Sequence, residues 1–280
     1  MRTIISGDNH IYKDNIEEQK LIFPEIMSYE ADRVIFLGDY YDRKLLTSEE
    51  LVFGTSIMKQ FKDKYKEVYV LEGNHDKDTI KYLISLGIDV RDNLVLDNNY
   101  YGHFFVEESM KAFNSAKRSL SELEQYDRVF LGHQHSFQIL GKHRFHVGSP
   151  LWIDFGEVND VSKSIIILED DKINIIELKT PIPMIDVFQI KDLGKLDNRN
   201  KVRYVIKDFK QLKKEANKLE DYRKKFYSFK IKLDFENKEE TLEISPKKDI
   251  NEIVEEWLKS ISDKEVKEEL SLTFKENDGN

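Results

Sequence analysis

Short β-branched runs alternate with segments of helical spacing over the first part of the chain. The runs Thr3–Ser6, Arg33–Leu37 and Glu67–Leu71 have the length and composition of strands. The segments between them, Asn15–Tyr29 and Ser48–Lys64, repeat apolar residues at helical intervals. This strand–helix–strand rhythm predicts an α/β fold, in which helices pack on a sheet whose early strands are parallel.

Strand-like runs dominate after Gly87. They are Leu94–Leu96, Tyr100–Val106, Arg128–Leu131, Gln138–Leu140, Arg144–Val147, Ser164–Leu168 and Lys172–Leu178. Asp170 and Asp171 are suited to a tight hairpin turn between the last two runs. We therefore expect a second, more antiparallel sheet that faces the first.

Two closely spaced prolines, Pro181 and Pro183, mark the clearest boundary in the chain, because they favour an extended linker. We expect one domain over residues 1–180 and a smaller α+β domain over residues 181–280. The smaller domain is expected to begin with a strand, a helix and two further strands, and to continue as helix from Asp249. Its last apolar stripe, which includes Ile253, Trp257 and Ile261, is interpreted as core of that domain.

The composition excludes several classes of protein. Hydrophobic residues make up 40% of the chain and charged residues 35%, which is typical of a globular protein. The chain has no cysteine, so disulfide scaffolds, thiolate metal sites and cysteine nucleophiles are excluded. No apolar run approaches the roughly 18 residues of a membrane span, and the first residues lack the pattern of a signal peptide. We expect a cytoplasmic protein without a membrane partner.

The charge is unevenly distributed along the chain. The whole chain carries −9, but residues 195–232 hold 14 basic and 5 acidic residues, a local balance of +9 that leaves −18 for the remainder. A basic segment on an otherwise acidic protein is expected of a surface that binds phosphate groups. A solvated, lysine-rich helix face is the alternative interpretation.

Five polar clusters follow predicted strands. They are Gly7-Asp8-Asn9-His10, Gly38-Asp39-Tyr40-Tyr41-Asp42, Gly73-Asn74-His75-Asp76, Gly102-His103 and Gly132-His133-Gln134-His135. Ligands in α/β proteins bind at the carboxyl ends of strands, so we expect these clusters to converge. Five of the seven histidines lie in them. Their oxygen and imidazole donors suit divalent cations such as Mn²⁺, Fe²⁺ or Zn²⁺, which predicts a shared metal site.

The ordered set of motifs over the first 180 residues resembles the calcineurin-like metallophosphoesterases. The resemblance implies a four-layer αββα sandwich, in which two facing mixed sheets are flanked by helices, and a two-metal phosphoesterase site. Such a site holds two ions about 3.5–4 Å apart on both sides of the reacting phosphate. The ligands that the resemblance implies are Asp8, His10 and His135 for one ion, Asn74, His103 and His133 for the other, and Asp39 as the bridge between them.

The same resemblance assigns roles to three neighbouring residues. His75 is expected to act beside the scissile phosphate, as a general acid or as a stabiliser of the transition state. Asp76 is expected to orient His75, and Asp42 is expected to support the metal ligands from behind. His143 and His146 match no ligand motif and are interpreted as structural. Tyr40 and Tyr41 are expected to pack against the sheet, with substrate stacking as the alternative.

A second signature narrows the resemblance. Gly148-Ser149-Pro150 followed by Phe155-Gly156-Glu157 is similar to the SbcD-type subunit of the double-strand-break repair nuclease complex. This similarity implies a DNA exonuclease and endonuclease of repair and recombination, a DNA-capping domain, a homodimer and an SbcC-type, SMC-like ATPase partner bound by the last helices. The expected cofactor is a pair of Mn²⁺ ions, with Mg²⁺, Fe²⁺ and Zn²⁺ as alternatives. DNA contacts are expected from Lys213, Lys214, Arg223, Lys224 and Lys225.

Two other functions are considered. One is a stand-alone phosphodiesterase that acts on small substrates such as cyclic nucleotides; it requires neither a capping domain nor a basic segment. The other is a binding scaffold without activity, which predicts lost ligands, whereas every ligand position of the motif set is filled. His103 follows His75 by only 28 positions. Relatives of the SbcD type carry a longer insert there, so part of the DNA-facing wall is expected to be absent.

Overall fold

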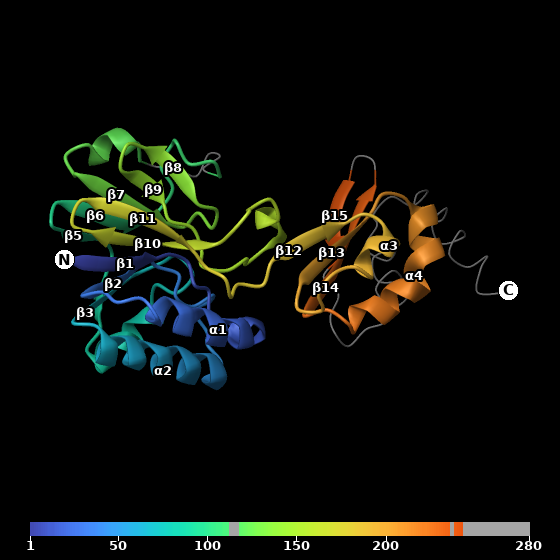
Figure 1. Ribbon diagram of the computed structural model, residues 1–280, viewed down its shortest axis with the longest axis horizontal. Helices are drawn as coiled ribbons and strands as arrows, with labels where there is room; N and C mark the ends of the chain where they lie inside the picture. The colour runs from blue at the N-terminus through green and yellow to red at the C-terminus, as the bar shows by residue number, and fades with distance from the viewer. Residues whose placement is uncertain (112–117, 236–237, 243–280) are drawn as a thin grey trace. The chain divides into compact units, whose positions relative to one another are not determined.

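The computed structural model describes residues 1–111, 118–235 and 238–242. It divides into two compact units, Met1–Ile182 and Pro183–Asn280, and each is described by itself. The division falls within the proline-containing segment that the sequence suggests as a boundary. Figure 1 shows the order of the elements along the chain.

The first sheet of unit 1 has six strands in the order β11-β10-β1-β2-β3-β4. The strands are β1 (Arg2–Ser6), β2 (Arg33–Phe36), β3 (Glu67–Leu71), β4 (Asp89–Arg91), β10 (Ser164–Glu169) and β11 (Lys172–Glu177). Strands β1 to β4 are parallel, as predicted for β1, β2 and β3, whereas β4 was not predicted. Strands β10 and β11 form the expected hairpin around Asp170 and Asp171.

The position of that hairpin differs from the prediction. We expected it in the second sheet, but β10 pairs antiparallel with β1 in the first. The sequence of β10 accounts for this. Ile165 and Ile167 enter the core beneath the helices, whereas Ile166 and Leu168 enter the core between the sheets. A strand that is apolar on both faces needs a place in a sheet that is covered on both sides.

Two helices cover one face of the first sheet (Figure 1). They are α1 (Ile16–Met27), which follows the 3₁₀ turn η1 (Lys13–Asn15), and α2 (Ser48–Lys64). Thr47 starts α2 with a reciprocal cap, in which its hydroxyl accepts from the Glu50 N–H and Glu50 accepts from the Thr47 N–H. The core on this face is built from Ile22, Phe23 and Ile26 of α1, Ile57, Met58 and Phe61 of α2, and Ile4, Val34 and Val70 of the sheet.

The second sheet has five strands in the order β5-β6-β7-β9-β8. They are β5 (Leu94–Leu96), β6 (Asn99–His103), β7 (Arg128–Gly132), β8 (Gln138–Gly141) and β9 (Arg144–His146). The expectation of a more antiparallel sheet is wrong for its centre, because β6, β7 and β9 are parallel and only the edge strands run antiparallel. Residues 104–127 connect β6 to β7, and a connection of that length permits the crossover that parallel strands require.

The two sheets face each other across an apolar layer. Ile5, Ile35 and Leu71 of the first sheet share this core with Tyr101, Phe130 and Phe145 of the second. On the outer face of the second sheet, Val129 and Leu131 pack with Val106 and with Leu123 of the 3₁₀ turn η3 (Leu120–Leu123). The predicted arrangement of two facing mixed sheets with helices is confirmed. Unit 1 also contains the 3₁₀ turns η2 (Ile80–Leu86) and η4 (Phe155–Glu157).

Unit 2 contains a sheet in the order β12-β13-β14-β15. Its elements are β12 (Met184–Val187), α3 (Ile190–Leu193), β13 (Lys201–Ile206), α4 (Phe209–Arg223), β14 (Ser228–Phe235) and β15 (Lys238–Leu242). The first three strands are parallel and β15 is antiparallel. The predicted strand, helix and two strands are present, whereas β12 and α3 were not predicted. The predicted helix from Asp249, with Ile253, Trp257 and Ile261, lies outside the described residues.

Among the helices of the described ranges, none has the length and apolar character needed to cross a membrane.

Candidate metal centre

The polar clusters meet where strands of both sheets end. Asp8, Asp39 and Asn74 follow β1, β2 and β3, which are neighbouring parallel strands of the first sheet. His103 is the last residue of β6, and His133 follows β7 in the second sheet. Parallel strands place their carboxyl ends at one edge, so the topology itself brings these residues together.

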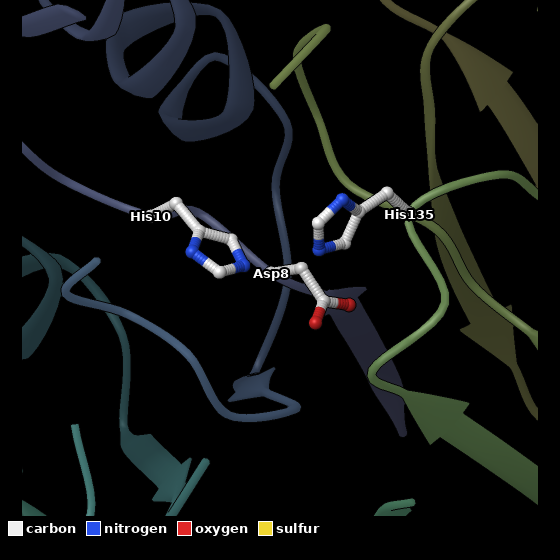
Figure 2. Close-up of side chains that lie close together, drawn as sticks. All are labelled: Asp8, His10 and His135. Carbon is white, nitrogen blue, oxygen red and sulfur yellow. The ribbon is translucent and has the colours of Figure 1, made fainter. Parts of the chain in front are cut away.

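The first group of side chains consists of Asp8, His10 and His135. One potential ligand atom from each lies within 4.8 Å of the others, and Figure 2 shows the three side chains converging. Asp8 and His10 are buried. Within the described part of the chain, neither Asp8 Oδ2 nor His10 Nε2 has a hydrogen-bond partner. Buried polar atoms are costly when unpaired, and a bound cation would satisfy both of these.

The second group consists of Asp39, His103 and His133, again with ligand atoms within 4.8 Å of one another. Asn74 joins this group, because its Oδ1 lies 3.1 Å from His103 Nε2. Asp39 Oδ2 lies 3.1 Å from His103 Nε2 and 3.6 Å from His10 Nε2. The Asp39 carboxylate therefore stands between the two groups, at the place where a bridging ligand is expected.

The backbone is strained at these positions. Asp8, His10, Asp39 and His133 have φ angles of 36°, 46°, 47° and 74°, in the left-handed region. Such conformations cost on the order of 1–3 kcal/mol each and cluster at functional sites. Gly38 has a φ of 101°, and a Cβ there would lie 2.5 Å from His103 Nδ1. The close approach of His103 to this turn thus requires a glycine.

Each of three imidazoles is oriented by an acceptor at its Nδ1. His10 Nδ1 lies 3.0 Å from Asp42 Oδ1, and His103 Nδ1 lies 2.7 Å from the Leu37 carbonyl. His135 Nδ1 lies 3.0 Å from Glu157 Oε1. An Nδ1–H that donates in this way leaves Nε2 available to bind a metal. Asp42 thus lies behind His10, where the resemblance placed it.

Glu157 was not predicted to contact the site. In the sequence it stands out only as the last residue of the Phe155-Gly156-Glu157 signature. That signature is the one signal that singles it out, because an isolated glutamate 22 residues after His135 has no spacing that indicates a contact.

His75 lies beside both groups, but Asp76 does not orient it. The His75 N–H donates to Asp39 Oδ1 at 2.9 Å, and its Nδ1 lies 2.8 Å from the Asp42 carbonyl. Its ring centroid is 4.8 Å from that of His10. Asp76 is buried and instead accepts from the N–H groups of Gly73 and Tyr41, each at 3.0 Å. The expected function of Asp76 is corrected: it holds two ligand-bearing loops together, and the Asp42 carbonyl orients His75.

The pKa values of the site histidines depend on burial and on the charged groups beside each ring. Burial lowers the pKa of His135, but hydrogen bonds to Asp154 and Glu157 outweigh burial and raise it to about 10. Burial likewise opposes the charged form of His103, yet its bond to Asp39 raises the pKa to about 9. Burial and the neighbouring His103 lower the pKa of His133 to about 4. Protonated imidazoles thus balance the negative charge of the carboxylates. Two bound cations would take the place of that positive charge.

The remaining side chains singled out in the sequence are placed as follows. Tyr40 and Tyr41 are completely buried, so they pack in the core and the stacking alternative is wrong. His146 is buried, and its Nε2 and Nδ1 contact Ser109 Oγ at 2.6 Å and the Gly132 carbonyl at 3.1 Å. His143 is exposed in the turn between β8 and β9.

The residues expected to contact DNA lie on or just after α4. Lys214, Lys224 and Lys225 are exposed. Arg223 has only 10% of its side chain exposed and pairs with Glu220 at 3.5 Å, so its guanidinium is poorly placed for a phosphate contact. The side chain of Lys213 lies outside the described residues.

Comparison with known proteins places the fold and the site in a family. The profile of the calcineurin-like phosphoesterases matches residues 1–207. No curated protein sequence matches the chain. Among solved structures, Vps29 from Entamoeba histolytica (a single mutant) is 16% identical with a TM-score of 0.36, covering 64% of this chain and 100% of that one. The Pseudomonas putida nuclease MPE is 16% identical with a TM-score of 0.36, covering 62% and 87%. Chaetomium thermophilum Vps29 is 12% identical with a TM-score of 0.35, covering 65% and 100%.

Overlaps of this size carry no inference about substrate. The profile match is of a different kind, because it spans most of the chain and includes the strands whose ends carry Asp8, Asp39, Asn74, His103 and His133. The chain belongs to the calcineurin-like phosphoesterase family.

Proposed function

We propose that the protein hydrolyses phosphodiester bonds of DNA with two divalent cations, as the nuclease subunit of an SbcCD-like repair and recombination complex. The observation that carries the catalytic part is the meeting of two ligand groups at Asp39. The carboxylate lies 3.1 Å from His103 Nε2 and 3.6 Å from His10 Nε2, so one side chain serves both groups. Mn²⁺ is the proposed metal; the oxygen and imidazole donors suit it, as they also suit Fe²⁺ and Zn²⁺.

The residues divide into those that hold metal and those that act on substrate. Asp8, His10 and His135 would hold one ion, Asn74, His103 and His133 the other, and Asp39 both. Bound cations would neutralise the charge of the phosphate and lower the pKa of a water molecule.

His75 is the candidate proton donor. Because its Nδ1–H donates to the Asp42 carbonyl, Nε2 is the nitrogen that would face the leaving oxygen, and the imidazolium form of His75 would supply the proton from it. Asp42 in turn contacts His10 through its side chain, so one residue positions both a ligand and the proton donor.

DNA is proposed as the substrate because of the basic segment and the second unit. The exposed Lys214, Lys224 and Lys225 would neutralise phosphates of the backbone. The proposed partners are an SMC-like ATPase, bound by the chain from Asp249 onward, and a second copy of this chain. The signature that ends in Glu157 supports these assignments through its similarity to SbcD-type subunits.

A second candidate is a phosphodiesterase of small substrates such as cyclic nucleotides. One feature of unit 2 favours it: several cations of the basic segment are neutralised locally. Arg203 makes two 2.7 Å bonds to Asp186, Lys207 pairs with Asp234, and Lys195 pairs with Asp192 at 2.6 Å. These pairs reduce the charge that the segment offers to DNA.

The salt dependence of DNA binding and cleavage decides between the two candidates. Purified protein with Mn²⁺ is given labelled single- and double-stranded DNA and, separately, a chromogenic phosphodiester. A triple variant, in which Lys214, Lys224 and Lys225 become Gln, should bind DNA more weakly and cleave it more slowly. The slope of log affinity against log salt concentration should become shallower, by roughly 0.7–0.9 for each phosphate that is no longer neutralised. Turnover of the chromogenic ester should be unchanged. An unchanged slope would favour the small-substrate candidate.

A further inference from the structure

A buried ion pair lies directly behind His135. Glu157 and Lys163 have 0% and 2% of their side chains exposed, and the Lys163 ammonium pairs with Glu157 Oε2. A buried pair of opposite charges usually adds little stability, because desolvation offsets the attraction between the charges. A contribution to stability therefore does not account for its position, which suggests a function connected with the histidine in front of it.

Glu157 contacts the side chain of that histidine. Its Oε1 lies 3.0 Å from His135 Nδ1 and also accepts from the Asp154 N–H at 3.2 Å. The ammonium of Lys163 pairs with the other oxygen of this carboxylate, so a negative charge on Glu157 is balanced in the buried site. An ionised acceptor fixes the tautomer of the imidazole and makes its Nε2 a stronger donor to a metal.

Lys163 contacts the backbone of the same residue. Its ammonium donates to the His135 carbonyl at 3.2 Å, to Ser149 Oγ at 3.4 Å and to Asp160 Oδ2 at 2.7 Å. The Ser149 N–H donates to the same carbonyl at 2.9 Å. His135 is therefore held at both ends, through its ring by Glu157 and through its carbonyl by Lys163 and Ser149.

We propose that Glu157 and Lys163 are positioning residues that set the affinity of the ion bound by Asp8, His10 and His135. His103, in the other group, differs because a neutral carbonyl, that of Leu37, backs its Nδ1 at 2.7 Å. The inference rests on metal binding at the centre and is independent of the substrate. Loss of Glu157 should thus weaken one of the two ions selectively.

The test is a titration of metal-free, full-length protein with Mn²⁺, followed by calorimetry, and with Co²⁺, followed by visible absorption. Glu157→Gln keeps the shape and an acceptor oxygen but removes the charge. It should lower the affinity for one ion by roughly 10–100-fold, with a smaller effect on the affinity for the other. It should also change the visible spectrum of bound Co²⁺. Affinities for both ions that equal those of the wild type would overturn the proposal.

Three further variants separate positioning from stability. Arg33→Met removes a buried guanidinium that pairs with the partly exposed Glu67 and the exposed Asp97, at the start of β2 and away from the centre. It should lower the unfolding temperature and leave both affinities unchanged. The double variant Glu157→Gln with Lys163→Met removes both charges together, so the unfolding temperature should recover relative to Lys163→Met alone.

The affinity of the first ion should stay low in the double variant. Recovery of affinity together with stability would mean that the pair is only structural and would overturn the proposal. A different outcome would refute only the proposed substrate: the variants change metal affinity as expected, but the wild-type protein with both ions bound does not cleave DNA.

Discussion

Replacing Gly73 by alanine tests the position of the Asp39 carboxylate, on which the proposed two-metal geometry depends. A Cβ at residue 73 would lie 2.0 Å from Asp39 Oδ1 and 2.2 Å from the Asp39 backbone nitrogen. The backbone nitrogen cannot move away without its loop, so the loop after β2 or the loop after β3 must move. Both loops are tied down, because Asp76 accepts from the N–H groups of Gly73 and Tyr41.

The size of the effect follows from this clash. Contacts of about 2 Å must open by more than 1 Å to reach ordinary separations, and overpacking of this kind costs about 1–3 kcal/mol. For a unit of this size, 1 kcal/mol lowers the unfolding temperature by about 2–4 °C, so a fall of about 2–12 °C is expected. A displaced bridging carboxylate should also weaken both metal ions, by roughly tenfold or more.

Thermal unfolding of metal-free protein and metal analysis of the loaded protein measure the two effects. Gly141→Ala is the matched control, because the nearest atoms to its Cβ lie at 3.9 and 4.0 Å. That variant should keep wild-type stability within a fraction of a kcal/mol and bind two ions. If Gly73→Ala bound two ions with wild-type affinity, Asp39 would not be held where the bridging function requires.

Three other outcomes are expected. Asp39→Asn should lose bound metal and activity while the fold, followed by circular dichroism, is retained; two ions per chain at normal turnover would contradict the bridge. His75→Ala should keep both ions but lose roughly 10²–10⁴-fold in cleavage rate, and loss of one ion would make His75 a ligand instead. Burial lowers the pKa of His146 from 6.5 to about 4, so the unfolded chain binds a proton in this window that the folded chain does not. The free energy of unfolding should therefore fall on acidification through pH 6.5 to 4, by at most about 3 kcal/mol from this group, and less steeply in His146→Gln when both are followed by denaturant titration.

Local patterns predicted most of the individual elements and the residues of the candidate site. The spacing of apolar residues predicted a helix over Ser48–Lys64, and α2 has these boundaries. The order of the Gly-Asp, Gly-Asn-His-Asp and Gly-His-x-His clusters identified the family, because each cluster is a short stretch whose function depends on residue type and on its place at a strand end. All the residues assigned as metal ligands meet in the structure, in two groups joined by Asp39.

Tertiary structure decided the partners that come from distant parts of the chain. Which strand lies beside β1 depends on burial of both faces of β10, and the order of strand-like runs along the chain does not express that requirement. Asp76 follows His75 directly, yet the turn directs its carboxylate to Gly73 and Tyr41, so adjacency in sequence misled the prediction. Glu157 reaches His135 only because Gly148, at a φ of 77°, and Ser149 return the chain against the His135 carbonyl. Short-range patterns determine which residues can bind a metal, whereas the groups that orient those residues are set by packing between segments, which local patterns do not encode.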